Sequence, residues 1–176
     1  MSAEIIVVRK EHLPRLRFIG KRYAEADRKN GGYAHKWAEW FANGWFADLA
    51  QLGMLEGVEN GYVGLMRCDA AACKGTFEYW IGLFFPPQTD APAGYEGIDI
   101  DEGDVGVCWI KGREDGGLYA MHDACVAKLR ESGMDRFRLD REKRVYFFER
   151  YNCPRFTQPD EDGKVILDYG VYLEGE

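Results

Sequence analysis

The chain has 176 residues, which is enough for one domain with a substantial core. Hydrophobic residues make up 46% of it and charged residues 30%, so its composition is that of a folded globular protein rather than a disordered one. The formal net charge of −7 disfavours contact with phosphate backbones, and we therefore expect no direct binding to nucleic acid. Aromatic residues reach 14%, more than a core of this size needs, which suggests that some rings line a pocket.

The first half of the chain predicts extended segments, one helix and two further strands. Glu4–Gly20 alternates well enough to be extended. Across Tyr33–Leu52 the apolar residues recur at steps of three and four, which predicts a single amphipathic helix. Tyr62–Met66 and Phe77–Phe85 are typical of strands, and two prolines end the second because proline cannot donate to a ladder.

The second half repeats this order. Gln88–Asp104 is rich in proline, glycine and acidic residues and has no periodicity, so we predict an acidic linker there. After it come a predicted strand, helix, strand and strand at Val105–Ile110, Gly117–Glu131, Val145–Tyr151 and Val165–Leu173.

Each half therefore has the order strand, helix, strand, strand. One such unit cannot cover its own sheet, whereas two related by a pseudo-twofold axis can. We predict a single α+β domain over residues 1–176, with two βαββ repeats at about 4–87 and 105–174. The sheet is expected to be antiparallel, with both helices on one face.

Several residue types bear on the compartment and on cofactors. The five cysteines form no Cys-x-x-Cys pair, which fits buried free thiols in a reducing cytosol. The start is not a signal peptide, and no stretch approaches the ~20 apolar residues of a membrane helix, so we expect a cytoplasmic protein that does not enter membranes. The three histidines are scattered, which predicts neither a metal nor another cofactor. With only two serines, a serine-nucleophile hydrolase is not expected.

Four segments together resemble the GyrI-like family, the effector-binding domain also found in AraC-type and MerR-type multidrug-sensing regulators. They are Phe18–Tyr23, Phe77–Pro87, Trp109–Gly112 and Phe148–Pro154, and the resemblance extends over about Ile5 to Leu173. The last segment is similar to the family's Glu-x-Tyr-x-x-Pro strand, whose glutamate lies in the ligand pocket. The chain departs from the family in its tryptophan-rich helix, and no helix-turn-helix precedes the domain in this sequence.

The segment Val145–Tyr151 carries the strongest candidate for a functional residue. Its period of two places Phe147, Glu149 and Tyr151 on one face. A carboxylate between two aromatic residues on a core-facing strand is costly to bury unpaired. Glu149 is then either an anionic anchor for a ligand or a general acid with a raised pKa. The alternative is a solvent-facing glutamate paired with a lysine or an arginine.

Aromatic residues elsewhere complete the candidate pocket. Alternation leaves open whether Tyr79 or Trp80 faces the same space, and the resemblance favours rings from this strand in the pocket wall. The tryptophans of the predicted helix, at helical spacing, are more typical of a core than of a ligand site. The candidate ligand-binding residues are Glu149, Phe147, Tyr151, Tyr79, Trp80, Trp109 and Trp40.

The leading functional prediction is a standalone domain that binds an aromatic, cationic or drug-like small molecule and acts by sequestration or as an effector sensor. The alternative is an enzyme, since the resemblance includes hydrolases of strained electrophilic molecules. In that case Glu149 would act as general acid or base beside Tyr151. A third hypothesis, inhibition of a partner protein, rests on the family name alone.

Overall fold

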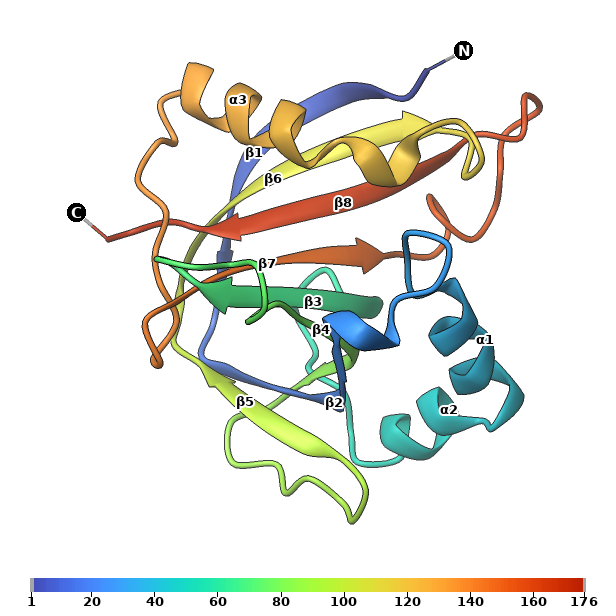
Figure 1. Ribbon diagram of the computed structural model, residues 1–176, viewed down its shortest axis with the longest axis vertical. Helices are drawn as coiled ribbons and strands as arrows, with labels where there is room; N and C mark the ends of the chain where they lie inside the picture. Colours follow the sequence, from blue (N-terminus) through green and yellow to red (C-terminus); the bar gives the residue numbers. More distant parts are fainter. Residues whose placement is uncertain (1, 176) are drawn as a thin grey trace.

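The protein, described here over residues 2–175 by a computed structural model, is an α+β domain built on one eight-stranded sheet with three α-helices (Figure 1). The strands are β1 (Glu4–Leu13), β2 (Leu16–Ala24), β3 (Tyr62–Asp69), β4 (Glu78–Phe85), β5 (Glu96–Ile100), β6 (Gly103–Gly112), β7 (Arg144–Tyr151) and β8 (Val165–Tyr172). The α-helices are α1 (Ala34–Ala42), α2 (Trp45–Ala50) and α3 (His122–Glu131), and short 3-10 turns lie at Glu25–Asp27 and Leu118–Ala120.

The strand order is β1-β6-β8-β7-β3-β4-β2-β5, and every neighbouring pair is antiparallel. Within the predicted first repeat, β2, β3 and β4 lie together, but β1 lies at the other end of the sheet, where it pairs with β6. Strands β6, β7 and β8 of the predicted second repeat are adjacent. The two groups meet where β3 pairs with β7. The predicted α+β class and antiparallel sheet are confirmed, while the pseudo-twofold axis remains a prediction.

Two sequence predictions about single segments are wrong. The expected helix Tyr33–Leu52 is broken into α1 and α2 at Gly44, whose φ of 68° is left-handed and does not continue a helix. The expected linker Gln88–Asp104 contains β5 and the first residues of β6. Strand β5 is short and pairs with β2 alone, so only Ile100 of its five residues is fully buried and no clear alternation marks it.

The cysteines also differ from expectation. Cys68 and Cys73 form a disulfide at the turn between β3 and β4, and Cys153 is exposed. Cys108 and Cys125 are the buried free thiols that the sequence predicted for all five. Within residues 2–175, none of the helices is long and apolar enough to cross a membrane.

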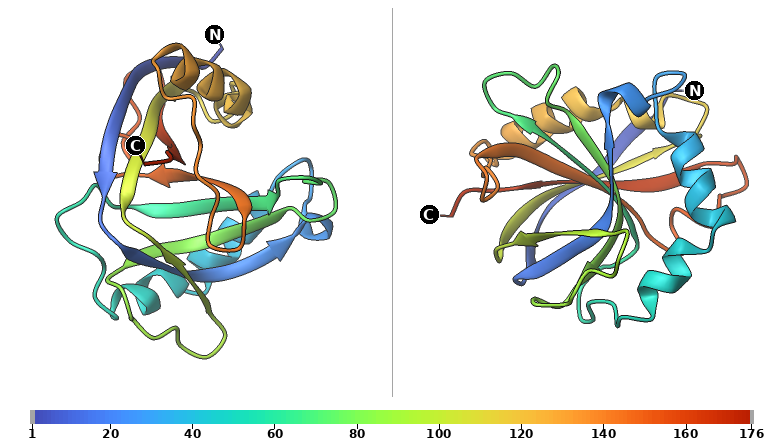
Figure 2. Two further views of the ribbon diagram at one scale, coloured as in Figure 1. Left: turned by 90° about the vertical axis from the view of Figure 1, so that its left-hand side faces the viewer. Right: turned by 60° about the horizontal axis from the view of Figure 1, so that its bottom comes forward.

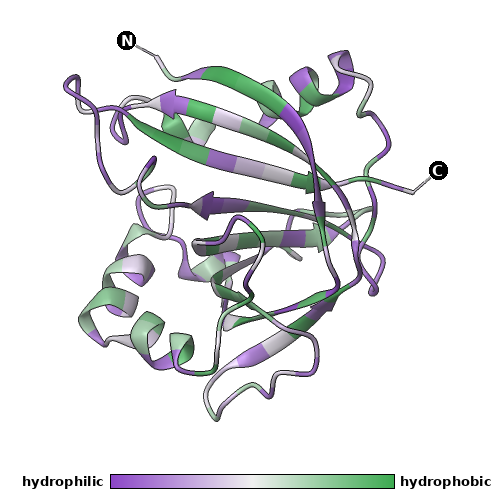
Figure 3. Ribbon diagram, turned by 180° about the vertical axis from the view of Figure 1, so that it is seen from behind, coloured by the Kyte–Doolittle hydropathy of each residue, from purple (hydrophilic) through white to green (hydrophobic). Residues whose placement is uncertain are grey.

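The sheet is strongly twisted and closes over one of its own faces (Figure 2). A core cluster on that face contains residues from all eight strands and none from a helix. Leu13 of β1 and Ile100 of β5 belong to this one cluster although their strands lie at opposite ends of the sheet. Hydrophobic and hydrophilic segments alternate along the strands, as expected where their two faces have different surroundings (Figure 3).

Two further clusters lie beneath the helices. Helices α1 and α2 bury Trp40, Phe46 and Leu49 against β2 and β4. Helix α3 buries Cys125 and Leu129 against β6 and β8. Phe147 of β7 packs partly against both clusters, and so marks the boundary between the two helical layers.

A network of ion pairs fixes β7 from the opposite side to Phe147. The guanidinium of Arg150 is fully buried and bonds to the buried Asp168 at 2.9 and 3.0 Å. It also bonds to both carboxylate oxygens of Glu11, at 3.0 and 2.8 Å. Arg155 reaches the same Asp168 and also Glu59. Since strand residues alternate, holding Arg150 in this network holds Glu149 on the other face.

Arg150→Met should lower the free energy of unfolding by about 3–5 kcal/mol, because it leaves the Asp168 carboxylate buried with fewer donors. Urea denaturation measures this loss. The matched control is Arg136→Met, which removes an exposed pair with Glu174 and should cost less than about 1 kcal/mol. Equal costs for the two variants would contradict the structural role given to Arg150.

Candidate functional site

A cavity of about 800 Å³ lies between α1 and the loop that precedes α3, over strands β3, β4 and β7. Aromatic side chains dominate its wall, and charged groups are few. Its lining residues are Arg28, Asn30, Gly31, Gly32, Tyr33, Ala34, Trp37, Phe41, Tyr62, Met66, Phe77, Tyr79, Glu114, Tyr119, Glu149, Tyr151, Phe156 and Thr157. This volume and composition are those of a small-molecule site.

Glu149 is the carboxylate within this cavity. It pairs with Gly64 of β3 on one side and Tyr169 of β8 on the other, so it lies in the middle of the sheet. The Tyr151 hydroxyl donates to its Oε2 at 2.7 Å. Part of the Glu149 surface is open to the cavity, but its carboxyl group lies deep inside the protein. Burial raises the pKa of this carboxyl group to about 7, although the hydrogen bond from Tyr151 acts to lower it.

The wall next to Glu149 is a hydrogen-bonded aromatic group. Trp37 Nε1 donates to the Tyr79 hydroxyl at 2.9 Å. Tyr79 stacks on Tyr33 with ring centroids 4.2 Å apart and planes 3° from parallel. Trp37 also packs on Tyr151, with centroids 4.7 Å apart. These contacts leave the rings little freedom, so they give the cavity a rigid aromatic wall.

Gly64 makes room for this arrangement. A Cβ at this position would lie 2.8 Å from the Tyr79 hydroxyl oxygen and 3.5 Å from the Trp37 ring. Gly64 faces Glu149 across the β3–β7 pair. The absence of a side chain therefore lets the Tyr79 hydroxyl lie close to the β3 backbone beside Glu149.

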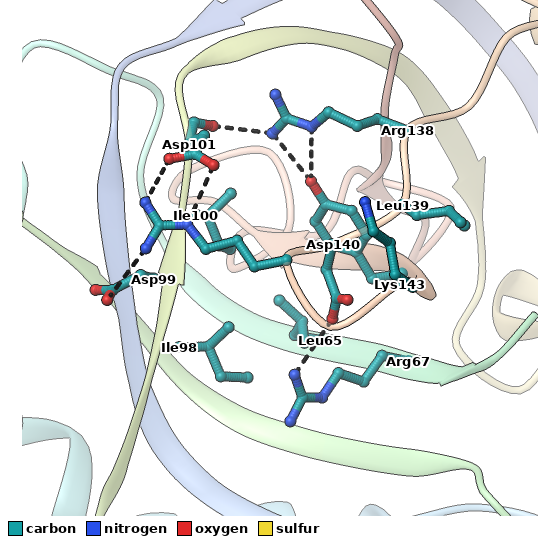
Figure 4. A pocket seen from close by; sticks show the side chains of 12 residues that line it. Leu65, Arg67, Ile98, Asp99, Ile100, Asp101, Arg138, Leu139, Asp140 and Lys143 are labelled. Carbon is teal, nitrogen blue, oxygen red and sulfur yellow. Dashed lines mark hydrogen bonds and ion pairs between the residues drawn. The ribbon is translucent and has the colours of Figure 1, made fainter.

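A second cavity, of about 340 Å³, lies near β5 and the loop before β7 (Figure 4). It is lined by several charged residues, and its arginines are already bound to groups of the protein. Arg141 pairs with Asp101, Arg67 with Asp140, and Arg138 with the Tyr146 hydroxyl. The bonds of Arg138 and Arg141 to Asp101 fasten the end of β5 to the loop, and the three arginines have few donors left for a ligand.

The structure brings together three of the seven candidate residues. Glu149, Tyr151 and Tyr79 line the cavity, and Phe147 lies behind it against His122 and Tyr169.

The other three candidates lie elsewhere. Trp80 belongs to the helix-free core and bonds to Glu78. Trp109 packs against the guanidinium groups of Arg9 and Arg155. Trp40 is fully buried and donates to the Tyr23 hydroxyl. The alternation of side chains along a strand explains why Trp80 and Trp109 do not line the cavity. Their neighbours in the strand face the helices, so Trp80 and Trp109 face the other way.

The sequence analysis missed several lining residues. Tyr33, Trp37 and Phe41 lie at intervals of four and form a single stripe along the length of α1, while Trp40 lies on the buried side. These three residues have i, i+4 spacing in the sequence. The core positions beside them are also aromatic or apolar, so hydrophobic periodicity alone does not separate the two sets. Arg28 and Glu114 lie in loops and had no periodic signal.

No family model and no curated protein matches this sequence. Solved structures do match. A candidate bacterial transcription regulator from Staphylococcus aureus MU50 has 18% identity and a TM-score of 0.66, over 97% of this chain and 99% of that one. SAV2435, solved with tetraphenylphosphonium bound, has 18% identity and a TM-score of 0.67 over 97% and 95%. A hydrolase from Listeria innocua has 11% identity and a TM-score of 0.51 over 95% and 91%. At these identities the chain shares a fold with these proteins.

Gly64→Ala tests the packing of the cavity wall. The added methyl group should push the Tyr79 hydroxyl from its place and break the bond from Trp37, since the stacked Tyr79 ring cannot move aside cheaply. We expect a loss of about 1–3 kcal/mol in unfolding free energy, from overpacking. We also expect a changed tryptophan fluorescence spectrum. Gly32→Ala is the control, because Gly32 lines the cavity and a Cβ there meets nothing within 4 Å. Unchanged fluorescence and stability in Gly64→Ala would refute this account.

Proposed function

We propose that the protein is a GyrI-like effector-binding domain that holds an aromatic cation in the cavity, with Glu149 as the counter-charge. It acts in the cytoplasm by sequestering its ligand or by sensing it as an effector. In this proposal a pseudo-twofold axis relates the two βαββ units. The helices of both units lie on the same face of the sheet, and the ligand binds between the units.

The deep carboxylate is the observation that carries this proposal. A carboxylate with a pKa of about 7 is half ionised at neutral pH, because the protein supplies it with one hydroxyl donor and few other compensating groups. A bound cation would supply the missing charge. The surrounding rings of Tyr79, Trp37 and Tyr151 would add cation–π contacts of about 0.5–2 kcal/mol each.

The structure of SAV2435 with tetraphenylphosphonium gives this proposal a suitable probe. Tetraphenylphosphonium is a bulky aromatic cation whose charge does not change with pH. A pH dependence of its binding would therefore report a group on the protein.

Glu149→Gln should weaken tetraphenylphosphonium binding by about tenfold or more, a loss on the order of 1–3 kcal/mol for a partly desolvated charge contact. Quenching of tryptophan fluorescence measures the affinity, since Trp37 lines the cavity. Neutral triphenylphosphine oxide is the matched ligand and should lose far less. Equal losses for both compounds, or none, would show that Glu149 does not act as a counter-charge.

The pH dependence has a definite sign. The folded pKa of Glu149 is raised from 4.5 to about 7, so tetraphenylphosphonium should bind more tightly as the pH rises through 7 and release a proton as it does. For the ligand-free protein, this group favours folding below pH 4.5, and that contribution is lost as the pH rises through 7. Both effects should be absent in Glu149→Gln, as isothermal titration and thermal unfolding across this range would measure. A wild-type affinity that does not change with pH would contradict the assignment.

A second candidate function is hydrolysis, favoured by the 2.7 Å bond between Tyr151 and Glu149. A carboxyl whose pKa lies near neutrality is suited to general acid–base catalysis, and an adjacent tyrosine can deliver or orient a proton. Under this reading Tyr151→Phe and Glu149→Gln would both abolish turnover of an electrophilic substrate while leaving its affinity nearly intact. If a screen of strained electrophiles shows no Glu149-dependent turnover, the binding function stands alone.

A further inference from the structure

The cavity carries charges of both signs. Of its lining residues within 2–175, Glu149 and Glu114 are acidic and Arg28 is basic. Glu149 lies within the sheet, whereas Glu114 and Arg28 are exposed in the loops before α3 and α1. Glu114 already accepts a bond from the Tyr119 hydroxyl at 2.7 Å. The remaining charge to account for is that of Arg28.

The backbone holds Arg28 at the cavity. Its amide nitrogen donates to the Glu25 carbonyl at 3.2 Å, which closes the 3-10 turn that follows β2. The next residues form a tight turn in which Lys29 and Gly32 exchange hydrogen bonds of 2.9 and 3.0 Å. Asn30 and Gly31, between them, have φ values of 50° and 80°. The backbone of Arg28 is therefore held by hydrogen-bonded turns on both sides.

The guanidinium of Arg28 lies against aromatic rings of the cavity wall. Its central carbon is 5.1 Å from the centroid of Phe77 and 5.6 Å from that of Tyr33. Across residues 2–175 the structure gives this side chain these ring contacts and a hydrogen-bonding contact with the Tyr33 hydroxyl, and no ion pair with a carboxylate. One contact occupies one of the five guanidinium donors, so the others remain available for a ligand, and a guanidinium binds a carboxylate through two parallel bonds.

Tyr33 connects this cation to the buried carboxylate. The ring that Arg28 contacts stacks on Tyr79, and Tyr79 lies beside Glu149 next to Gly64. An aromatic ligand along this wall would have a negative group near one part of it and a positive group near another. A ligand with a positive charge alone would be opposed by Arg28, since like charges in a partly desolvated site repel.

We propose that Arg28 makes the cavity selective for amphoteric aromatic compounds, whose cationic part lies toward Glu149 and whose acidic group bonds to Arg28. This inference rests on the proposed function and specifies its ligand class. A carboxylate fits Arg28 best, because its two oxygens match the guanidinium donors. The aromatic body of the ligand would cover Tyr33 and Tyr79.

A pair of rhodamine dyes tests this selectivity. A rhodamine with a free carboxyl group is zwitterionic at neutral pH, and its methyl ester is a cation with the same ring system. The wild-type protein should bind the free acid more tightly than the ester, by about tenfold for a charged hydrogen-bonded pair at a partly exposed site. Fluorescence anisotropy of the dye gives both affinities.

Arg28→Gln should weaken the free acid by about the same factor and leave the ester unchanged or tighter, so that the preference disappears or reverses. Arg28→Lys keeps the charge without the two parallel donors, and should retain part of the preference. Arg136→Gln, at an exposed arginine that pairs with Glu174 and does not line the cavity, should leave both affinities as in the wild type.

The outcomes separate this inference from the proposed function. A wild-type protein that binds the ester as tightly as the acid, with a ratio that Arg28→Gln does not change, overturns the role of Arg28 and leaves cation binding in place. Failure of both dyes and of tetraphenylphosphonium to bind the folded wild-type protein overturns the proposed function itself. A preference for the acid that disappears in Arg28→Gln and persists in Arg136→Gln supports both.

Discussion

The alternation of side chains along β7 is the constraint on which the rest of the structure depends. Tyr146, Phe148 and Arg150 face the helix-free core, and Phe147, Glu149 and Tyr151 face the helical layers. Arg150 is bound on its side by Asp168 and Glu11. A shift of β7 by one residue would place Glu149 among the acidic partners of Arg150 and would place Arg150 at the cavity. Both side chains would then lack partners of opposite charge. The ion network thus fixes the register that positions the site.

The cavity exists because the two helical layers cover different parts of the same sheet. Helices α1 and α2 pack over β2 and β4, and α3 packs over β6 and β8, so the central strands β3 and β7 lie between the two covered regions. Gly64 on β3 adds space there, and Tyr33 and Trp37 form one side of the opening. The site is therefore a consequence of how two short helical layers share an eight-stranded sheet.

Much of this arrangement could be predicted from the sequence, and the exceptions have physical causes. The strands and the special position of Glu149 follow from period two and from the cost of a carboxylate among aromatic residues, both of which are local properties. The role of Trp80 could not be decided locally, because β4 carries large aromatic residues on both faces. Trp109 is the one aromatic residue of β6, where apolar side chains lie on both faces, so its strand gives no clear alternation. Arg28 and Glu114 acquire their positions from turns whose place beside the cavity depends on tertiary packing. The break at Gly44 has no counterpart in the apolar spacing, which continues across it.

Two glutamates of the sheet differ in how far the protein compensates their charge. Glu78 on β4 bonds to Arg67, Arg144 and the Trp80 indole, and these donors lower its pKa to about 2 despite burial. Glu149 lies two strands away and receives one hydroxyl, so burial dominates and raises its pKa to about 7. The protein can therefore satisfy a buried carboxylate fully, and does so at Glu78, where the charge serves stability. At Glu149 the compensation is left incomplete beside a cavity of about 800 Å³. An uncompensated charge costs stability in the free protein, and under the proposed function a ligand of opposite charge would recover that cost as binding energy.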